Sequence, residues 1–297
     1  MTATIRTVTG DVPGLGITDA HDHLFFRSRA LPGQELDDIA AARGELTAFA
    51  TAGGSAMVQW TPLGLGRGAE SLPDLSRETG VRIVAATGLH RAEHYAPELL
   101  TRVMPRLAEL FTTELTTGIG TTGVRAGLIK VAGGFHGLDT HARSTLHAAA
   151  AASTATGAPI AVHLEAGTAS AEVLDFLDVA PSKVILGHLE RFPDVSTAVE
   201  AAARGAFVAL DGPSRANAAT DWRLRDLTTA IIEAGHADQL LFGGDTTTAR
   251  ARGSAEGPGP VWLLERLRPW LEHRFGTDIA EAVFVTNPSR AFAAEWP

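Results

Sequence analysis

The sequence ITDAHDH at residues 17–23 reads as a buried β-strand that ends in residue types able to bind a divalent metal. Four later segments have the same form, with His, Lys or Asp at their carboxyl ends: residues 126–130, 159–163, 184–188 and 240–245. A polar residue at the end of one apolar strand means little. Five such strands along the chain indicate one site where parallel strands converge, which is where a (β/α)8 barrel carries its active site.

Strand-like and helix-like segments alternate along the whole chain. We expect eight strands, at residues 17–23, 55–60, 82–88, 126–132, 159–163, 183–188, 206–211 and 239–244. We expect helices at residues 35–52, 71–79, 96–117, 139–156, 168–178, 194–204, 221–234 and 260–275. Apolar strands that alternate with helices are typical of a parallel sheet buried on both faces. The sequence therefore predicts an α/β fold, a (β/α)8 TIM barrel. A doubly wound open sheet is the alternative, but it does not explain ligand-type residues after five strands.

Length and composition narrow the class of protein. The chain has 297 residues, 45 % of them hydrophobic, which suits one barrel domain over residues 1–297 because barrels typically have about 250 residues. The net charge is −9 and no Lys/Arg block is present, so we expect neither nucleic acid nor an anionic membrane as partner. Cysteine is absent, so any metal ligands must be nitrogen or oxygen atoms. We find no signal-peptide pattern and no apolar stretch long enough to span a membrane, and we expect the protein in the cytoplasm.

Six residues of the predicted strand ends are candidate metal ligands: His21, His23, Lys130, His163, His188 and Asp245. His21 and His23 are two apart on a strand, so both side chains point to the same side and can present two imidazoles to one ion. Taken alone, each histidine could be a hydrogen-bonded core residue or face a polar barrel end, and Asp245 could be an N-cap. Their common placement favours a metal site.

Lys130 is unusual because lysine is rarely buried without a partner, and this one ends an apolar run. A charged ammonium would repel a metal ion. A lysine whose pKa is lowered by burial can instead react with CO2 to give a carbamate, which is an anionic oxygen ligand. The alternative is a lysine at the barrel mouth that pairs with a carboxylate.

The order HxH, Lys, His, His and Asp resembles the phosphotriesterase-like branch of the amidohydrolase superfamily. The similarity runs from Thr7 to Phe292 and includes further stretches: residues 7–11, 61–67, 114–119, 123–130, 187–191, 211–215 and 287–290. The resemblance implies two divalent ions, with His21, His23 and Asp245 on the more buried one. It places His163 and His188 on the more exposed one, and a carboxylated Lys130 and a hydroxide between the two. Asp245 is then also the catalytic proton acceptor.

The resemblance also sets expectations for the ions, the substrate and the assembly. Zinc suits the ligands, and manganese, cobalt and iron remain open. The partner is a small-molecule substrate. Related barrels are often dimers, so we expect a homodimer.

Two departures from the family bear on the substrate. The phosphotriesterases proper carry two carboxylates, which serve a proton relay, where this chain has Glu190 and Arg191. The sequence HLER at residues 188–191 resembles instead the branch that opens lactones, including phosphorylated sugar lactones. That branch often carries Lys and Tyr after the Ser-Arg of strand seven, whereas Ser214 and Arg215 are followed here by Ala-Asn-Ala.

Five residues near the predicted barrel mouth are candidate substrate contacts: Arg215, Arg191, His90, Tyr95 and Arg250. Arg215 could hold an anion as a bidentate fork. Arg191 could instead pair with Glu165 or Glu190 as a structural bridge. The remaining three could be solvated loop residues.

We therefore predict a metal-dependent hydrolase that uses a bridging hydroxide to open a lactone or a related carboxylic ester. The alternative is a phosphotriester or organophosphate hydrolase with the same metal centre, because the ligand set cannot separate the two reactions. An alternative of another class is a non-catalytic metal-binding module, against which the complete ligand set argues.

Overall fold

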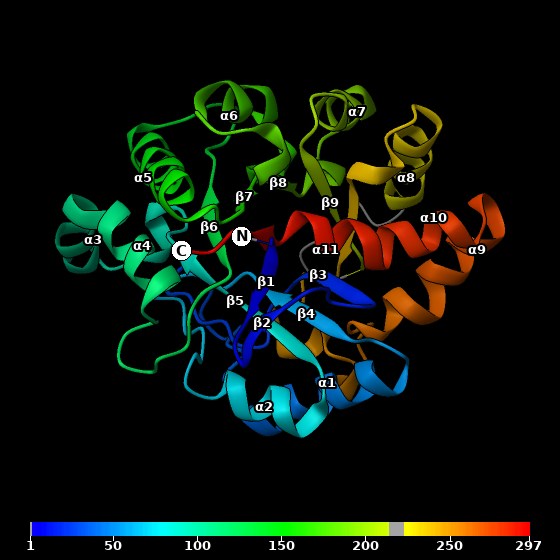
Figure 1. The fold of residues 1–297 in the computed structure, drawn as a ribbon, viewed down its shortest axis with the longest axis horizontal. Helices are drawn as coiled ribbons and strands as arrows, with labels where there is room; N and C mark the ends of the chain where they lie inside the picture. The colour runs from blue at the N-terminus through cyan, green and yellow to red at the C-terminus, as the bar shows by residue number, and fades with distance from the viewer. Residues whose placement is uncertain (1, 214–222) are drawn as a thin grey trace.

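At the centre of the computed structural model, which describes residues 2–213 and 223–297, eight parallel strands form a barrel (Figure 1). The strands lie side by side in chain order: β3 (Thr18–Asp22), β4 (Ala56–Gln59), β5 (Arg82–Gly88), β6 (Leu128–Ala132), β7 (Ile160–His163), β8 (Val184–Gly187), β9 (Phe207–Asp211) and β10 (Leu240–Gly243). This order confirms the predicted barrel and excludes a doubly wound sheet, whose strand order reverses at a switch point. At the seam between β10 and β3, the N–H of Asp245 donates to the carbonyl of His21 at 2.9 Å.

Helices surround the barrel, as Figure 1 shows. They are α1 (Ile39–Thr51), α2 (Leu72–Thr79), α3 (Pro97–Val103), α4 (Leu107–Thr116), α5 (Thr140–Thr156), α6 (Ser170–Phe176), α7 (Val195–Ala203), α8 (Leu224–Glu233) and α9 (Arg268–Phe275). The predicted helix 96–117 is divided by a 3-10 turn at Met104–Arg106, where Pro105 has no N–H to donate. The predicted helix 35–52 begins only at Ile39, because the Asp38 carboxylate caps its first turn.

The sequence did not predict the elements at the two chain ends. A small antiparallel sheet consists of β11 (Ala293–Ala294), β1 (Thr4–Thr7) and β2 (Gly10–Val12), in that order. Two short helices, α10 (Thr277–Glu281) and α11 (Asn287–Ala291), precede β11. Both chain ends therefore meet in the middle of the view in Figure 1, and Ile5 and Phe292 pack against the residues that fill the barrel.

The apolar core has two layers. One layer lies inside the barrel and consists of inward-facing strand residues such as Val58, Leu128 and Ile185. The larger layer lies between the strands and the surrounding helices. Within the described ranges, none of the helices has the length and apolarity needed to cross a bilayer.

Candidate metal centre

A cavity of about 420 Å³ lies at the carboxyl ends of the barrel strands. All six predicted metal ligands line it: His21, His23, Lys130, His163, His188 and Asp245. The structure therefore brings together residues that are far apart in the sequence, such as His21 and Asp245, which are 224 positions apart. Because neighbouring strands are parallel, their carboxyl ends share one end of the barrel.

His21, His23 and Asp245 form one compact group at the barrel seam. The Nε2 atoms of His21 and His23 each lie 3.5 Å from Oδ1 of Asp245. The ligand atoms of the three residues lie within 4.8 Å of one another, which is close enough for one ion. Gly243 permits this approach, because a Cβ there would lie 2.4 Å from the His21 carbonyl oxygen. These three residues fit a single divalent ion.

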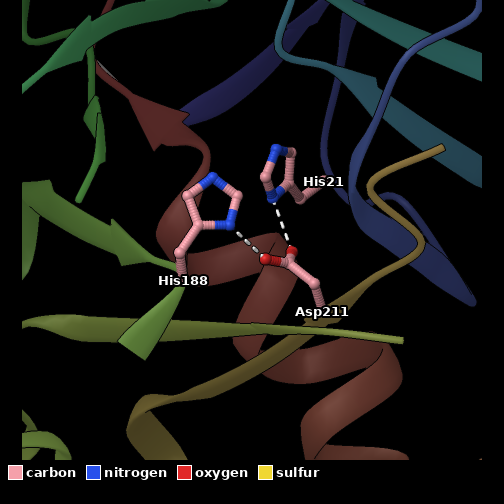
Figure 2. Close-up of side chains that lie close together, drawn as sticks. All are labelled: His21, His188 and Asp211. Carbon is pink, nitrogen blue, oxygen red and sulfur yellow. Dashed lines mark hydrogen bonds and ion pairs between the residues drawn. The ribbon is translucent and has the colours of Figure 1, made fainter. Parts of the chain in front are cut away.

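Hydrogen bonds at Nδ1 hold the imidazoles in the tautomer that a metal requires. Nδ1 of His23 lies 2.7 Å from the hydroxyl of Thr61, which itself donates to the Phe25 carbonyl at 2.6 Å. The hydroxyl must therefore accept from the Nδ1–H of His23, which leaves the Nε2 lone pair free. Nδ1 of His21 and Nδ1 of His188 both face the Asp211 carboxylate, at 2.6 and 2.5 Å (Figure 2). A carboxylate only accepts, so Nε2 is the free ligand atom in both.

His163 is the most open of the four histidines, with a side chain 14 % exposed. Its Nε2 lies 3.1 Å from Oε2 of Glu165, so Nδ1 is the atom free for a metal. The His163 and His188 ring centroids are 4.3 Å apart. In the part of the chain that the structure describes, however, His163 belongs to neither compact group of His and Asp ligand atoms. A second ion beside His163 and His188 therefore needs a further ligand.

Lys130 is the side chain placed to supply that ligand. It lies in the middle of β6, not at the end of its strand as the sequence suggested. The side chain is buried, and the carboxylates of Asp245 and Glu165 are near enough to act on its pKa. The alternative of a lysine that pairs with a carboxylate therefore stays open. Burial lowers the pKa of Lys130 to about 7. A buried amine of this kind fits carbamate formation, because the neutral form is the one that reacts with CO2.

The charge states of the histidines and of Asp245 also suit metal binding. Burial lowers the pKa of His21 to about 4, and it lowers the pKa values of His163 and His188 as well. These imidazoles are therefore neutral, as ligands must be. Burial acts to raise the pKa of Asp245, but His21, His23 and His188 in their protonated forms, together with the Arg191 cation, outweigh it and hold that pKa well below the usual range.

Arg191 pairs with a predicted metal ligand. Its Nη2 donates to Oδ2 of Asp245 at 2.7 Å, and its Nε lies 3.7 Å from Oε1 of Glu190. Arg191 also lines the cavity, so the predicted bridge to Glu190 and the predicted place beside the substrate are both compatible with its position. The pairing with Asp245 was not expected from the sequence.

The other predicted substrate contacts lie in different places. His90 lines the cavity, and its Nδ1 accepts from the N–H of Arg91 at 2.8 Å, which leaves Nε2–H as a donor. Tyr95 is not among the cavity residues, and its hydroxyl accepts the backbone N–H of His90 at 2.7 Å. Arg250 is exposed and is also absent from the cavity wall. Arg215 lies outside the described residues.

Sequence reasoning missed Asp211 and Thr61 as members of the site. Asp211 is the last residue of β9, so the rule that found the ligands at strand ends could have found it too. Thr61 follows β4 by two residues and carries no comparable signal, because threonine is common in loops.

Comparisons with known proteins agree with this geometry. The family model described as Phosphotriesterase family matches residues 3–292. The phospho-furanose lactonase of Mycoplasmopsis synoviae is 28 % identical over 97 % of this chain and 91 % of its own length. The aryldialkylphosphatase of Saccharolobus solfataricus is 25 % identical over 94 % of this chain and 95 % of its own. The crystal structure of a lactonase from Listeria monocytogenes matches with a TM-score of 0.88 and 26 % identity, over 97 % of this chain and 98 % of that one.

Proposed function

This chain belongs to the phosphotriesterase family of metal-dependent hydrolases, and we propose that it binds two divalent ions and opens a lactone or a related carboxylic ester. His21, His23 and Asp245 would hold one ion. His163 and His188 would hold the other, and a carbamate on Lys130 would give one oxygen to each. Zinc is the ion we expect, with manganese, cobalt or iron as alternatives. When bound, such ions polarise the substrate oxygen and lower the pKa of a shared water.

The chain's own residues would move the proton. Asp245 is ionised and faces the cavity, so it can accept a proton from the attacking water as the new carbon–oxygen bond forms. The same carboxylic acid then donates that proton to the ring oxygen as the ring carbon–oxygen bond breaks. His90 lines the cavity, and its Nε2–H can donate a hydrogen bond to a substrate.

The pairing of Arg191 with Asp245 is the observation that favours a lactone. The leaving oxygen of a lactone is an alkoxide, which leaves poorly unless it is protonated, so the proton taken by Asp245 is used in the same turnover. An aryl phosphotriester releases a stable aryloxide, and the proton must then pass from Asp245 to solvent. Two described side chains lie near Asp245 Oδ2. The Arg191 cation, at 2.7 Å, cannot accept a proton, and Nδ1 of His188, at 4.0 Å, already faces Asp211.

Phosphotriester or organophosphate hydrolysis is the second candidate. It is supported by the similarity to the aryldialkylphosphatase over nearly the full length of both chains. The proposed ligand set suits both reactions, because water attacks a metal-polarised centre in each. The expected homodimer and cytoplasmic location remain predictions, and size-exclusion chromatography with light scattering would test the former.

Metal analysis combined with a substrate panel tests this proposal. Protein purified without chelators would be measured for metal by mass spectrometry and then assayed with a series of lactones, with paraoxon as comparator. About two ions per chain and lactone opening are the expected results. Turnover of paraoxon alone would favour the second candidate. Absence of metal, and of activity after reconstitution, would favour a non-catalytic module.

A further inference from the structure

Asp211 lies between two histidines, His21 and His188, that are assigned to different metal positions. Its Oδ1 lies 2.6 Å from Nδ1 of His21, and its Oδ2 lies 2.5 Å from Nδ1 of His188. Figure 2 shows the two rings converging on this one carboxylate. All three side chains are buried. The two oxygens of Asp211 therefore each hold a residue assigned to a different ion.

We infer that Asp211 is a positioning residue for both metal positions at once, and that it couples the affinities of the two ions. This inference rests on the proposed binuclear site. The carboxylate accepts both Nδ1–H groups, so it fixes the tautomer and the orientation of both rings. Such an outer hydrogen-bond partner typically changes metal affinity by about 10- to 100-fold.

Asp211 itself is not placed to be a metal ligand, although its oxygens and the His21 and His188 nitrogens lie close enough together to hold an ion. The short contacts are made through Nδ1, and an ion there would have to displace both ring protons. Asp211 is completely buried and is not among the described residues that line the cavity. It contacts the two histidines on the side that faces away from the cavity.

Strand pairing and a backbone hydrogen bond hold Asp211 in the barrel sheet. Asp211 ends β9 and is paired with Gly243 of β10, and the N–H of Gly212 donates to the Gly243 carbonyl at 2.7 Å. The ring of His21 also stacks on Trp60, with centroids 3.8 Å apart and an interplanar angle of 24°. A shift of Asp211 would therefore act directly on the ring orientations.

Thr61 provides a matched control, because it holds Nδ1 of His23 and no other proposed ligand. Asp211→Asn keeps the shape of the side chain but has no charge and only one acceptor oxygen. One imidazole then loses its acceptor, and the other keeps a weaker one. Asp211→Ala removes both acceptors. Thr61→Val removes only the partner of His23.

Calorimetric titration of metal-free protein with Zn²⁺, and the absorption spectrum of the Co²⁺ form, test the inference without an activity assay. We expect Asp211→Ala to lower the affinity for both ions by at least about tenfold. Asp211→Asn should also lower both affinities, one of them more than the other. Thr61→Val should lower the affinity for one ion only. Circular dichroism checks the folding of each variant, and Asp211→Asn gives the result if Asp211→Ala does not fold.

The possible failures are distinguishable. If the unmodified chain binds two ions and Asp211→Asn leaves one or both within threefold, the coupling by Asp211 is refuted while the binuclear site stands. If the unmodified chain binds fewer than two ions, the proposed function and this inference both fail.

Discussion

Glu45 of α1 holds the loop that follows β10, and its replacement by glutamine is expected to loosen that loop. Its side chain is 4 % exposed. Oε2 accepts the N–H of Gly253 at 3.0 Å and Oε1 accepts the N–H of Ser254 at 2.9 Å. Thr247, earlier in the same loop, lines the cavity. The two hydrogen bonds therefore tie to α1 a loop whose earlier part lines the cavity.

The size of the effect follows from these two bonds. A hydrogen bond to a charged group contributes about 1.5 to 3 kcal/mol. Glutamine keeps one acceptor oxygen but turns an NH2 group toward the other N–H. Glu45→Gln therefore removes one of the two hydrogen bonds and leaves the other with a neutral acceptor. We expect a local cost of about 3 kcal/mol, which corresponds to about 100-fold faster amide exchange at tenfold per 1.4 kcal/mol.

Hydrogen–deuterium exchange at Gly253 and Ser254 measures this cost directly. A loop can open without unfolding of the barrel, so the melting temperature is a less direct measure. Glu78→Gln is the control. Glu78 pairs with Arg43 at 2.6 Å, but these side chains are 48 % and 45 % exposed, and such surface pairs contribute about 0 to 1 kcal/mol. Exchange at both amides within threefold of the unmodified protein in Glu45→Gln would refute the reasoning.

Three further changes test the proposed site. Asp245→Asn should leave metal partly bound but lower kcat by about 10² to 10⁴, because the proton acceptor is lost, and kinetics combined with metal analysis would show it. Nearly unchanged turnover would remove Asp245 from the mechanism. Lys130→Ala should lose activity that short carboxylic acids partly restore by replacing the carbamate, whereas no rescue with metal retained would argue against a carboxylated lysine. Tyr95→Phe should leave the buried N–H of His90 without its acceptor and lower the free energy of unfolding by about 1 to 3 kcal/mol in denaturant. A direct substrate contact would instead raise KM at unchanged stability.

The barrel could be predicted from sequence because every strand carries its own signal. Each of the eight predicted strands overlaps an observed one, and their apolar runs mark residues buried on both faces of the sheet. The antiparallel sheet at the chain ends could not be predicted in this way. Its strands have only two to four residues, and Thr4 gains its partner Ala294 from the far end of the chain. Pairing over such a separation is decided by tertiary packing.

The candidate ligands could be named from sequence because strand ends converge in a barrel, but their partners could not. Arg191 was expected beside Glu165, Glu190 or a substrate, and its bond to Asp245 depends on how two loops from different strands approach each other. Tyr95 was placed at the mouth by its position after β5, yet its hydroxyl turns to the backbone of His90. Side-chain direction in loops depends on local backbone geometry that residue type does not determine.

The candidate metal centre rests directly on the interior of the barrel. Trp60 belongs to the cluster that fills the barrel, its ring stacks on His21, and its indole N–H donates to the Ala20 carbonyl at 2.8 Å. The same side chain therefore packs the core and restrains a proposed ligand. Ions that bind only the folded chain stabilise it by an amount that grows with their concentration. Folding and metal binding should thus be linked through Trp60, and a change deep in the barrel should alter metal affinity without touching the cavity wall.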